Sequence, residues 1–216
     1  MVKITSKVTT ILFDFDGTLA DTFSEIVKIY NKIAPAYNCR PVDLNDLDYI
    51  RSKRPQELLR DYNISTYNLP FVILKGRKEL RTKIHEIASF GNLVDIILQL
   101  KEKGYQLGIL SANSRKNIKA FLANHKIEDA FDFIHNSKNI FGKSKKIKKI
   151  LKEYHLKHNQ VLMVGDETRD IEAAKKMDVP IVAVGWGFNS INALMALQPN
   201  YWVTEPSEII QVVEQL

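Results

Sequence analysis

The chain has 216 residues, of which 45% are hydrophobic and 26% are charged, the composition of a globular domain long enough to bury a real core. Lys and Arg number 31 against 25 Asp and Glu, a net charge of +6, and the single cysteine, Cys39, excludes an intrachain disulfide and any cysteine-cluster metal site. No apolar run forms a signal peptide or approaches the ~18 residues of a membrane span, so we expect a cytoplasmic protein that does not cross a membrane.

Strand and helix patterns alternate along most of the chain. Apolar, β-branched residues at 8–15 indicate a first buried strand, and a helix with Asn92 as its N-cap and Gly104 as its stop follows after a long gap. Later helices are expected to begin at Asn113 or Ser114, at Ser144, before the apolar positions Ile171, Ala174 and Met177, and at Pro206-Ser207. The strands between these helices are expected at 105–110, 131–134, 161–164, 180–184 and, as a possible edge strand, 201–203. This alternation predicts a doubly wound, Rossmann-like α/β core whose parallel sheet binds ligands at the carboxyl ends of its strands.

The gap after the first strand is too long for a loop in a compact domain. Its apolar spacing is helical over 23–33, with Asp21 as the expected N-cap, and again over 80–87, while Pro55 is well placed to begin a helix between them. We therefore expect a core of 1–19 and 90–216, with a small α-helical cap inserted at 20–89.

Polar residues follow several of the expected strands. The first strand ends in Asp14-Phe15-Asp16-Gly17-Thr18, the second ends at Ser111, and a later one ends in Gly165-Asp166-Glu167-Thr168-Arg169-Asp170. Lys143 precedes the helix expected at Ser144. Because parallel strands bring their carboxyl ends to one edge, four acids, a hydroxyl and a lysine are expected around one crevice.

The charge of this crevice predicts a metal ion. Four carboxylates and a phosphate carry about −6, and Lys143 returns only one positive charge, so the set requires a divalent cation. Oxygen ligands without His or Cys select Mg²⁺, which pairs with carboxylates and substrate phosphate. A free carboxylate could then attack phosphorus to form an aspartyl-phosphate, and a second carboxylate two residues on could act as general acid and base.

These four motifs resemble those of the haloacid dehalogenase-like hydrolase superfamily over nearly the whole chain. The resemblance implies Asp14 as nucleophile, Asp16 as general acid/base and Lys143 as the third catalytic residue. It also implies a Mg²⁺ site formed by Asp14, Asp16 through its backbone carbonyl, and Asp166, with Asp170 assisting through water or orienting Lys143. The residues expected to bind substrate are Gly17, Thr18, Ser111, Ala112 and Asn113. The insert is similar to the helical cap of phosphoglycolate phosphatase-like members.

Two departures from the family pattern matter. Many relatives carry Lys-Pro in the third motif, whereas Lys143 precedes Ser144, so Lys145 and Lys138 are alternatives for the functional lysine. The dehalogenases lack the second acid of the first motif, so Asp16 argues against dehalogenation. In the cap, Arg51, Lys53 and Arg54 are candidates for gripping an acidic substrate tail, although a solvated surface is the favoured interpretation.

The leading hypothesis is a Mg²⁺-dependent phosphatase acting on a small phosphorylated metabolite, phosphoglycolate-like or a sugar phosphate. The alternatives are a sugar-phosphate mutase, a nucleotidase or polynucleotide end phosphatase, and a non-enzymatic receiver-like signalling or degenerate phospho-binding protein. Nucleic-acid binding is disfavoured because six lysines cluster between 138 and 149 on one expected helix face. We expect a monomer or a homodimer.

Overall fold

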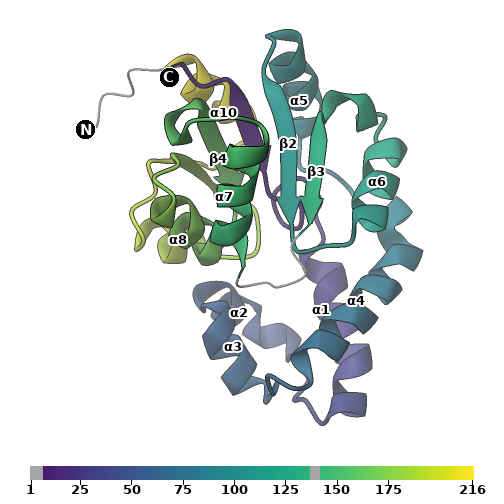
Figure 1. Ribbon diagram of the computed structural model, residues 1–216. Coiled ribbons are helices and arrows are strands. Elements are labelled where there is room, and N and C mark those ends of the chain that lie inside the picture. Colours follow the sequence, from purple (N-terminus) through teal and green to yellow (C-terminus); the bar gives the residue numbers. More distant parts are fainter. Residues whose placement is uncertain (1–6, 137–141) are drawn as a thin grey trace.

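The computed structural model describes residues 7–136 and 142–216 and contains a sheet of six parallel strands in the order β3-β2-β1-β4-β5-β6 (Figure 1). The strands are β1 (Thr10–Phe13), β2 (Gln106–Ser111), β3 (Phe133–Asn136), β4 (Val161–Gly165), β5 (Ile181–Val184) and β6 (Tyr201–Val203). The chain adds β2 and β3 on one side of β1 and the later strands on the other. The strand order therefore reverses between β1 and β4, where open α/β sheets bind their ligands. The expected doubly wound fold is confirmed.

Helices cover both faces of this sheet. They are α5 (Leu93–Glu102), α6 (Arg115–Asn124), α7 (Lys143–Glu153), α8 (Thr168–Lys176), α9 (Ile191–Met195) and α10 (Glu208–Glu214). Alternate strand residues serve opposite faces, since Ile11 packs with α5, α6 and α10, while Leu12 packs with α7 and α8. All four residues of β1 are buried, as a parallel sheet covered on both sides requires.

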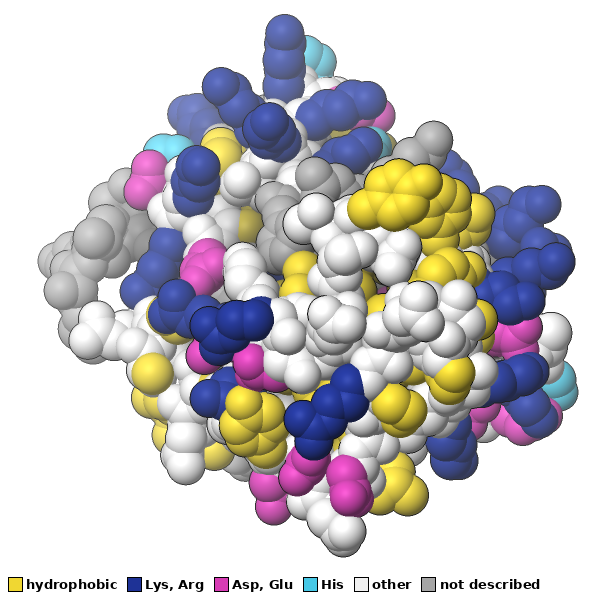
Figure 2. Space-filling view, turned by 90° about the horizontal axis from the view of Figure 1, so that it is seen from below, with side chains coloured by type: hydrophobic (Ala, Val, Ile, Leu, Met, Phe, Trp, Pro, Cys, Tyr) yellow, Lys and Arg dark blue, Asp and Glu magenta, His cyan; other side chains and the backbone are white. Residues whose placement is uncertain are grey.

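Between β1 and α5 the chain forms a separate layer of helices, α1 (Phe23–Ile33), α2 (Leu47–Ser52), α3 (Pro55–Asp61) and α4 (Leu69–Lys83). Short 3-10 turns flank them at Ala34–Tyr37, Leu44–Asp46 and Ile84–Glu86. Figure 1 shows the arrowheads of β2 and β3 pointing toward this layer. Seen from below, the molecule shows Lys and Arg side chains spread over this face, with hydrophobic and acidic side chains among them (Figure 2). Among the helices of the described ranges, none is both long and apolar enough to cross a bilayer.

Several expected boundaries were displaced. Helix α7 begins at Lys143 with Gly142 as its N-cap, so Ser144 lies inside the helix and does not cap it. Helix α1 begins after Thr22 and not after Asp21, because the Asp21 amide donates to the Ala88 carbonyl at 2.9 Å and joins the two ends of the insert. Ser114 does cap α6, accepting from the Asn117 amide.

Three other elements also differ in extent. The first strand is shorter than expected, covering only Thr10–Phe13, because the chain turns after the Asp14 amide has donated to the Val164 carbonyl. Strand β3 lies two residues later than expected, since Asp132 accepts from the Leu107 amide and the ladder begins at Phe133. The terminal helix begins at Glu208, whose carboxylate accepts from the amides of the turn before it.

Gly108 shows how tightly the sheet packs against its cover. A Cβ placed on Gly108 would lie 2.1 Å from Cε2 of Phe133, whose ring is stacked on Tyr154 with centroids 4.2 Å apart. We expect Gly108→Ala to lower the free energy of unfolding by about 2 kcal/mol, because the ring cannot retreat without losing its own packing. Urea unfolding measures this, with Gly76→Ala as control, since nothing lies within 4 Å of a Cβ there. Equal stability of Gly108→Ala and the parent would contradict the packing argument.

Candidate active site

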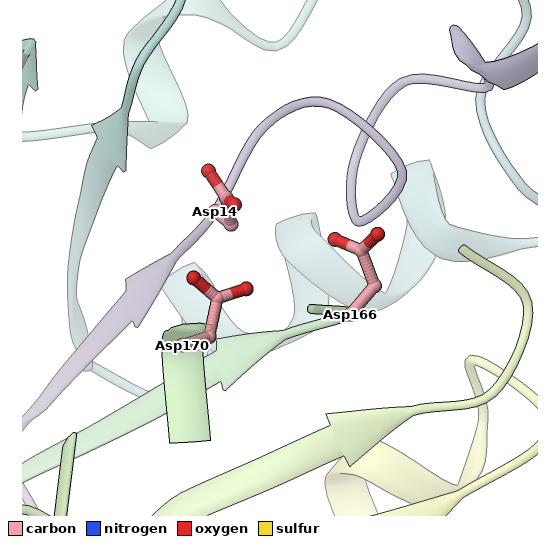
Figure 3. Close-up of side chains that lie close together, drawn as sticks. All are labelled: Asp14, Asp166 and Asp170. Carbon is pink, nitrogen blue, oxygen red and sulfur yellow. The ribbon is translucent and has the colours of Figure 1, made fainter. Parts of the chain in front are cut away.

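Three buried aspartates meet at the reversal of strand order. Asp14 directly follows β1, Asp166 follows β4, and Asp170 lies in the first turn of α8. One carboxylate oxygen from each lies within 4.8 Å of the others, and none of the three residues is more than 2% exposed (Figure 3). The short parallel strands β1 and β4 bring together acids that are about 150 residues apart in sequence, as the strand-end argument predicts.

Lys143 is the buried cation of this cluster. Its ammonium donates to Asp14 Oδ2 at 2.7 Å and also to Asp170, and the residue is 4% exposed. Burial opposes its charge, but Asp14 and Asp170 hold the pKa of Lys143 above its usual value. Lys145, two residues on, is exposed, and Lys138 lies outside the described residues. Lys143 is thus the lysine that contacts the acids, and the start of α7 at this residue places it there.

Burial dominates the titration of the acids. It raises the pKa of Asp14 to about 7, with Lys143 opposing the rise. Burial also raises the pKa of Asp166 well above its ordinary value, and the neighbouring charges of Glu167 and Asp14 add to it. A positive charge placed beside these acids would stabilise their ionised forms and lower their pKa values.

Arg169 is a second cation of the site, only partly exposed, that the sequence reasoning did not assign to it. Its guanidinium pairs with Glu167, and Glu167, Asp14 and Asp170 together hold the pKa of Arg169 above its usual value although burial opposes the charge. Lys143 and Arg169 face four carboxylates, those of Asp14, Asp166, Glu167 and Asp170. With these acids ionised, the described site keeps an excess of negative charge.

Asp166 is held by a close backbone cradle. Its oxygens accept from the Thr18 hydroxyl at 2.5 Å and from the Phe188 amide at 2.7 Å. A Cβ on Gly17 or on Gly187 would approach Asp166 to 2.2 Å, so both positions require glycine for the backbone to come this near. Oxygen-only donors, burial and excess negative charge fit a hard divalent cation such as Mg²⁺.

Asp16 faces away from this cluster although it stands two residues from Asp14. Its carboxylate accepts from Asn113 Nδ2 at 2.8 Å and from the Thr22 hydroxyl at 3.2 Å. Burial raises the pKa of Asp16. The structure therefore separates the two acids of the first motif, and the Asp16 side chain does not join the three carboxylates that could hold a metal.

The second motif lies beside Asp16. Ser111 ends β2, is fully buried, and accepts from the Asn113 amide at 2.9 Å, which leaves its own proton available for donation. Asn113 in turn accepts from the Asn117 side chain and so is fixed between α6 and Asp16. The carbonyl of Ala112 accepts from Arg77 of α4. The residues expected to bind substrate thus surround the crevice, with Gly17 and Thr18 supporting Asp166.

The basic residues proposed for gripping a substrate tail are engaged elsewhere. Arg51 donates to the Gly187 carbonyl at 2.6 Å and stands over the Phe23 ring, Lys53 pairs with Glu57 at 3.9 Å, and Arg54 pairs with Glu172 at 3.7 Å. Lys53 and Arg54 therefore agree with the favoured interpretation as surface groups. Arg51 instead connects α2 to the loop that contains Gly187.

Arg77 of α4 is a cation near Asp16 that sequence reasoning missed. It is half-buried on α4, where burial lowers the pKa of its guanidinium and the charge of nearby Asp16 opposes that shift. The sequence held one weak signal for this role: Arg77 stands close to the apolar positions Val72, Ile73 and Leu80. That signal can be recognised only once the structure shows that these residues line one cavity.

This geometry can be set beside known proteins. Residues 11–184 match the family described as haloacid dehalogenase-like hydrolase. The phosphoglycolate phosphatase of Synechococcus elongatus is 33% identical over 206 residues, which cover 95% of this chain and 97% of that protein. The pyrophosphatase PpaX of Bacillus cereus is 23% identical over 97% of this chain and 98% of its own length.

The fold comparison agrees with the sequence comparison. A crystal structure described as a "predicted phosphatase from Clostridium acetobutylicum" superposes with a TM-score of 0.84 at 23% identity, covering 98% of this chain and all of the other. Its low identity makes it evidence for the fold alone. The family match over most of the chain shows that this protein belongs to the haloacid dehalogenase-like hydrolases.

Proposed function

We propose that this protein is a magnesium-dependent phosphatase that hydrolyses a small phosphorylated metabolite, such as phosphoglycolate or a sugar phosphate, through an aspartyl-phosphate intermediate. That it is a phosphatase, a phosphoric monoester hydrolase, follows from its family and its relative at 33% identity. The observation that carries the proposal is the buried cluster of Asp14, Asp166 and Asp170, with Lys143 in contact with Asp14 and Asp170.

The chemistry divides between the two acids of the first motif. The Asp14 carboxylate attacks phosphorus, and the bond from phosphorus to the ester oxygen breaks. Asp16, whose raised pKa favours the protonated form, gives its proton to that leaving oxygen. In the second step Asp16 takes a proton from water as that water attacks the phosphorus of the aspartyl-phosphate. The bond from phosphorus to the Asp14 oxygen breaks, inorganic phosphate is released, and the Asp14 carboxylate is restored.

The remaining residues stabilise charge and fix positions. Lys143 and the Ser111 hydroxyl donate to phosphoryl oxygens, and Asp170 orients Lys143. Mg²⁺, held by the Asp14 and Asp166 carboxylates and the Asp16 backbone carbonyl, would neutralise the charge that develops on those oxygens.

We also propose that residues 20–89 form a cap over a core of 1–19 and 90–216. The two connections lie side by side, because Ala20 bridges to Ser89 and the Ser89 hydroxyl donates to the Leu19 carbonyl at 3.1 Å. A pair of adjacent linkers is what a hinged insert needs, since it lets the helices move with little change in the sheet.

The alternative functions predict different results in activity assays. A mutase of the same fold would return an isomer of a sugar monophosphate, whereas a phosphatase releases inorganic phosphate. A polynucleotide end phosphatase would lose activity to competing DNA, and the competition would weaken steeply with salt. The face in Figure 2 gives little support to the latter, because its Lys and Arg are interspersed with acidic and hydrophobic side chains.

Location and assembly belong to the same proposal. The lone cysteine, Cys39, is buried and unpaired, which suits the reducing cytoplasm, and either a monomer or a homodimer is compatible with a site built from one chain.

A phosphate-release screen over metabolite phosphates and pyrophosphate tests the function, and metal dependence tests the site. EDTA should stop turnover and Mg²⁺ should restore it. At about one hundred times its Kd, Mg²⁺ should also stabilise the protein by about 2.7 kcal/mol, roughly 5–10 °C in Tm. Asp166→Asn should remove this thermal shift. Turnover unaffected by chelation, or an unchanged shift in Asp166→Asn, would count against the metal assignment.

A further inference from the structure

A largely apolar cavity of about 250 Å³ lies between α1 and α4. Its apolar wall is formed by Ile26, Ile29, Ile33, Val72, Ile73 and Leu80. At the end toward the sheet it is bounded by Asp16, Ala112 and Asn113, so it adjoins the group proposed to protonate the leaving oxygen. The part of a substrate that leaves with that oxygen is therefore the part that this cavity would surround.

Gly76 keeps the cavity open. It lies in the middle of α4 on the same face as Val72 and Leu80, four residues to either side, and it lines the cavity. Nothing stands within 4 Å of a Cβ built on it, so packing does not require a glycine. A glycine inside a helix is less favourable than alanine, and here its effect is to leave space that a side chain would occupy.

Arg77 supplies a cation to the same cavity. Its guanidinium donates to the Ala112 carbonyl, and among the described residues it forms no ion pair with a carboxylate. A half-buried guanidinium has further N–H donors, and a carboxylate is the acceptor whose planar geometry matches them. The cavity thus offers one cationic group at its rim, three further polar side chains in Asp16, Tyr30 and Asn113, and a wall that is otherwise hydrocarbon.

We propose that the leaving group of the substrate is an α-hydroxy acid with an apolar side chain, whose carboxylate binds Arg77 and whose side chain fills the cavity between α1 and α4. This rests on the proposed phosphatase function. The ester oxygen, the carboxylate and the side chain of such a compound share one carbon, just as Asp16, Arg77 and the apolar wall border one space. A polyol is disfavoured because its hydroxyls would lose water and find few partners.

Four phosphate esters separate the two features. They are those of α-hydroxyisovalerate, with carboxylate and branched side chain, of glycolate, with carboxylate only, of isobutanol, with the side chain only, and of glycerol, with neither. We expect kcat/KM to be greatest for the hydroxyisovalerate ester, by about tenfold or more over the glycolate ester. Equal kcat/KM for all four would overturn the inference while leaving the phosphatase function intact. If neither these four esters nor any metabolite ester released phosphate, the function itself would be overturned.

Filling the cavity provides the sharper test. Gly76→Leu should lower the ratio of kcat/KM for the hydroxyisovalerate ester to that for the glycolate ester by about tenfold, and Gly76→Ala by less. Leucine and alanine favour the helix over glycine, so both variants should fold with an undiminished Tm. Lys78→Leu, on the exposed side of α4, is the matched control and should leave the ratio unchanged. A ratio unchanged in Gly76→Leu as well would overturn the inference.

Arg77→Gln isolates the carboxylate contact. It should reduce kcat/KM for the two carboxylated esters by about tenfold or more relative to the isobutyl ester. A uniform loss on all esters would instead mean that Arg77 only supports Ala112, which would overturn its assignment to the substrate carboxylate.

Discussion

Replacement of Asp14 by asparagine should lower phosphatase turnover by about four orders of magnitude or more. The amide has nearly the shape of the carboxylate but no anionic oxygen with which to attack phosphorus. The fold should survive for two reasons. The Phe15 amide donates to Asp14 Oδ1 at 2.7 Å, and the side-chain oxygen of Asn can accept the same hydrogen bond. Lys143 also keeps its contact with Asp170. Steady-state phosphate release and a thermal melt of the variant measure the two effects.

The intermediate gives this prediction an independent readout. Acid-quenched parent enzyme should carry a phosphate on the peptide that contains Asp14, and the Asp14→Asn variant should not. Asp16→Asn is a useful companion, because it leaves the nucleophile in place and removes the proton donor, so a slowly formed phosphoenzyme should persist longer in it. Appreciable turnover by folded Asp14→Asn, or phosphate on a different residue, would refute the assignment of the nucleophile.

The convergence of the acids was predictable because it depends on topology. Apolar runs alternating with helical spacing specify parallel strands, and the carboxyl ends of parallel strands meet at one edge. Asp14 and Asp166 each stand directly after a strand, so their proximity follows without any knowledge of side-chain directions. The helical nature of the insert followed from the same kind of pattern.

Side-chain direction across the crevice was not predictable. The turn after β1 sends Asp16 toward Asn113, almost a hundred residues away in sequence, and Asp14 toward Asp166, and no local pattern records such a division. Arg77 lies on a helix whose face is apolar, so periodicity alone assigns it to the surface. Arg169 is part of the fourth motif, and its position beside Asp14 and Asp170 depends on the packing of α8 against the strands.

Replacement of Lys143 by methionine should damage both catalysis and stability. The change leaves Asp14 and Asp170 buried without the ammonium that both contact, which we expect to cost about 3 kcal/mol of unfolding free energy in EDTA and about a thousandfold in turnover. When the pKa of a carboxyl group is raised in the folded state, the folded protein loses stability as the pH rises from the ordinary pKa to the raised one. For Asp14 this interval runs from 3.8 through about 7. Because the variant lacks the cation that restrains this rise, its stability deficit should widen with pH over that interval.

Lys145→Met is the matched control, since it removes a lysine from the same helix two residues on, where the side chain is exposed. It should keep turnover within about twofold and stability within about 0.5 kcal/mol of the parent. Urea unfolding at several pH values, with phosphate release measured on the same preparations, compares the pair. A loss of turnover in Lys145→Met with normal activity in Lys143→Met would transfer the third-motif role to Lys145. If the stability deficit of Lys143→Met shrank as the pH rose, the electrostatic explanation would be contradicted. Such a result would mean that burial destabilises the Lys143 ammonium more than it destabilises the carboxylates.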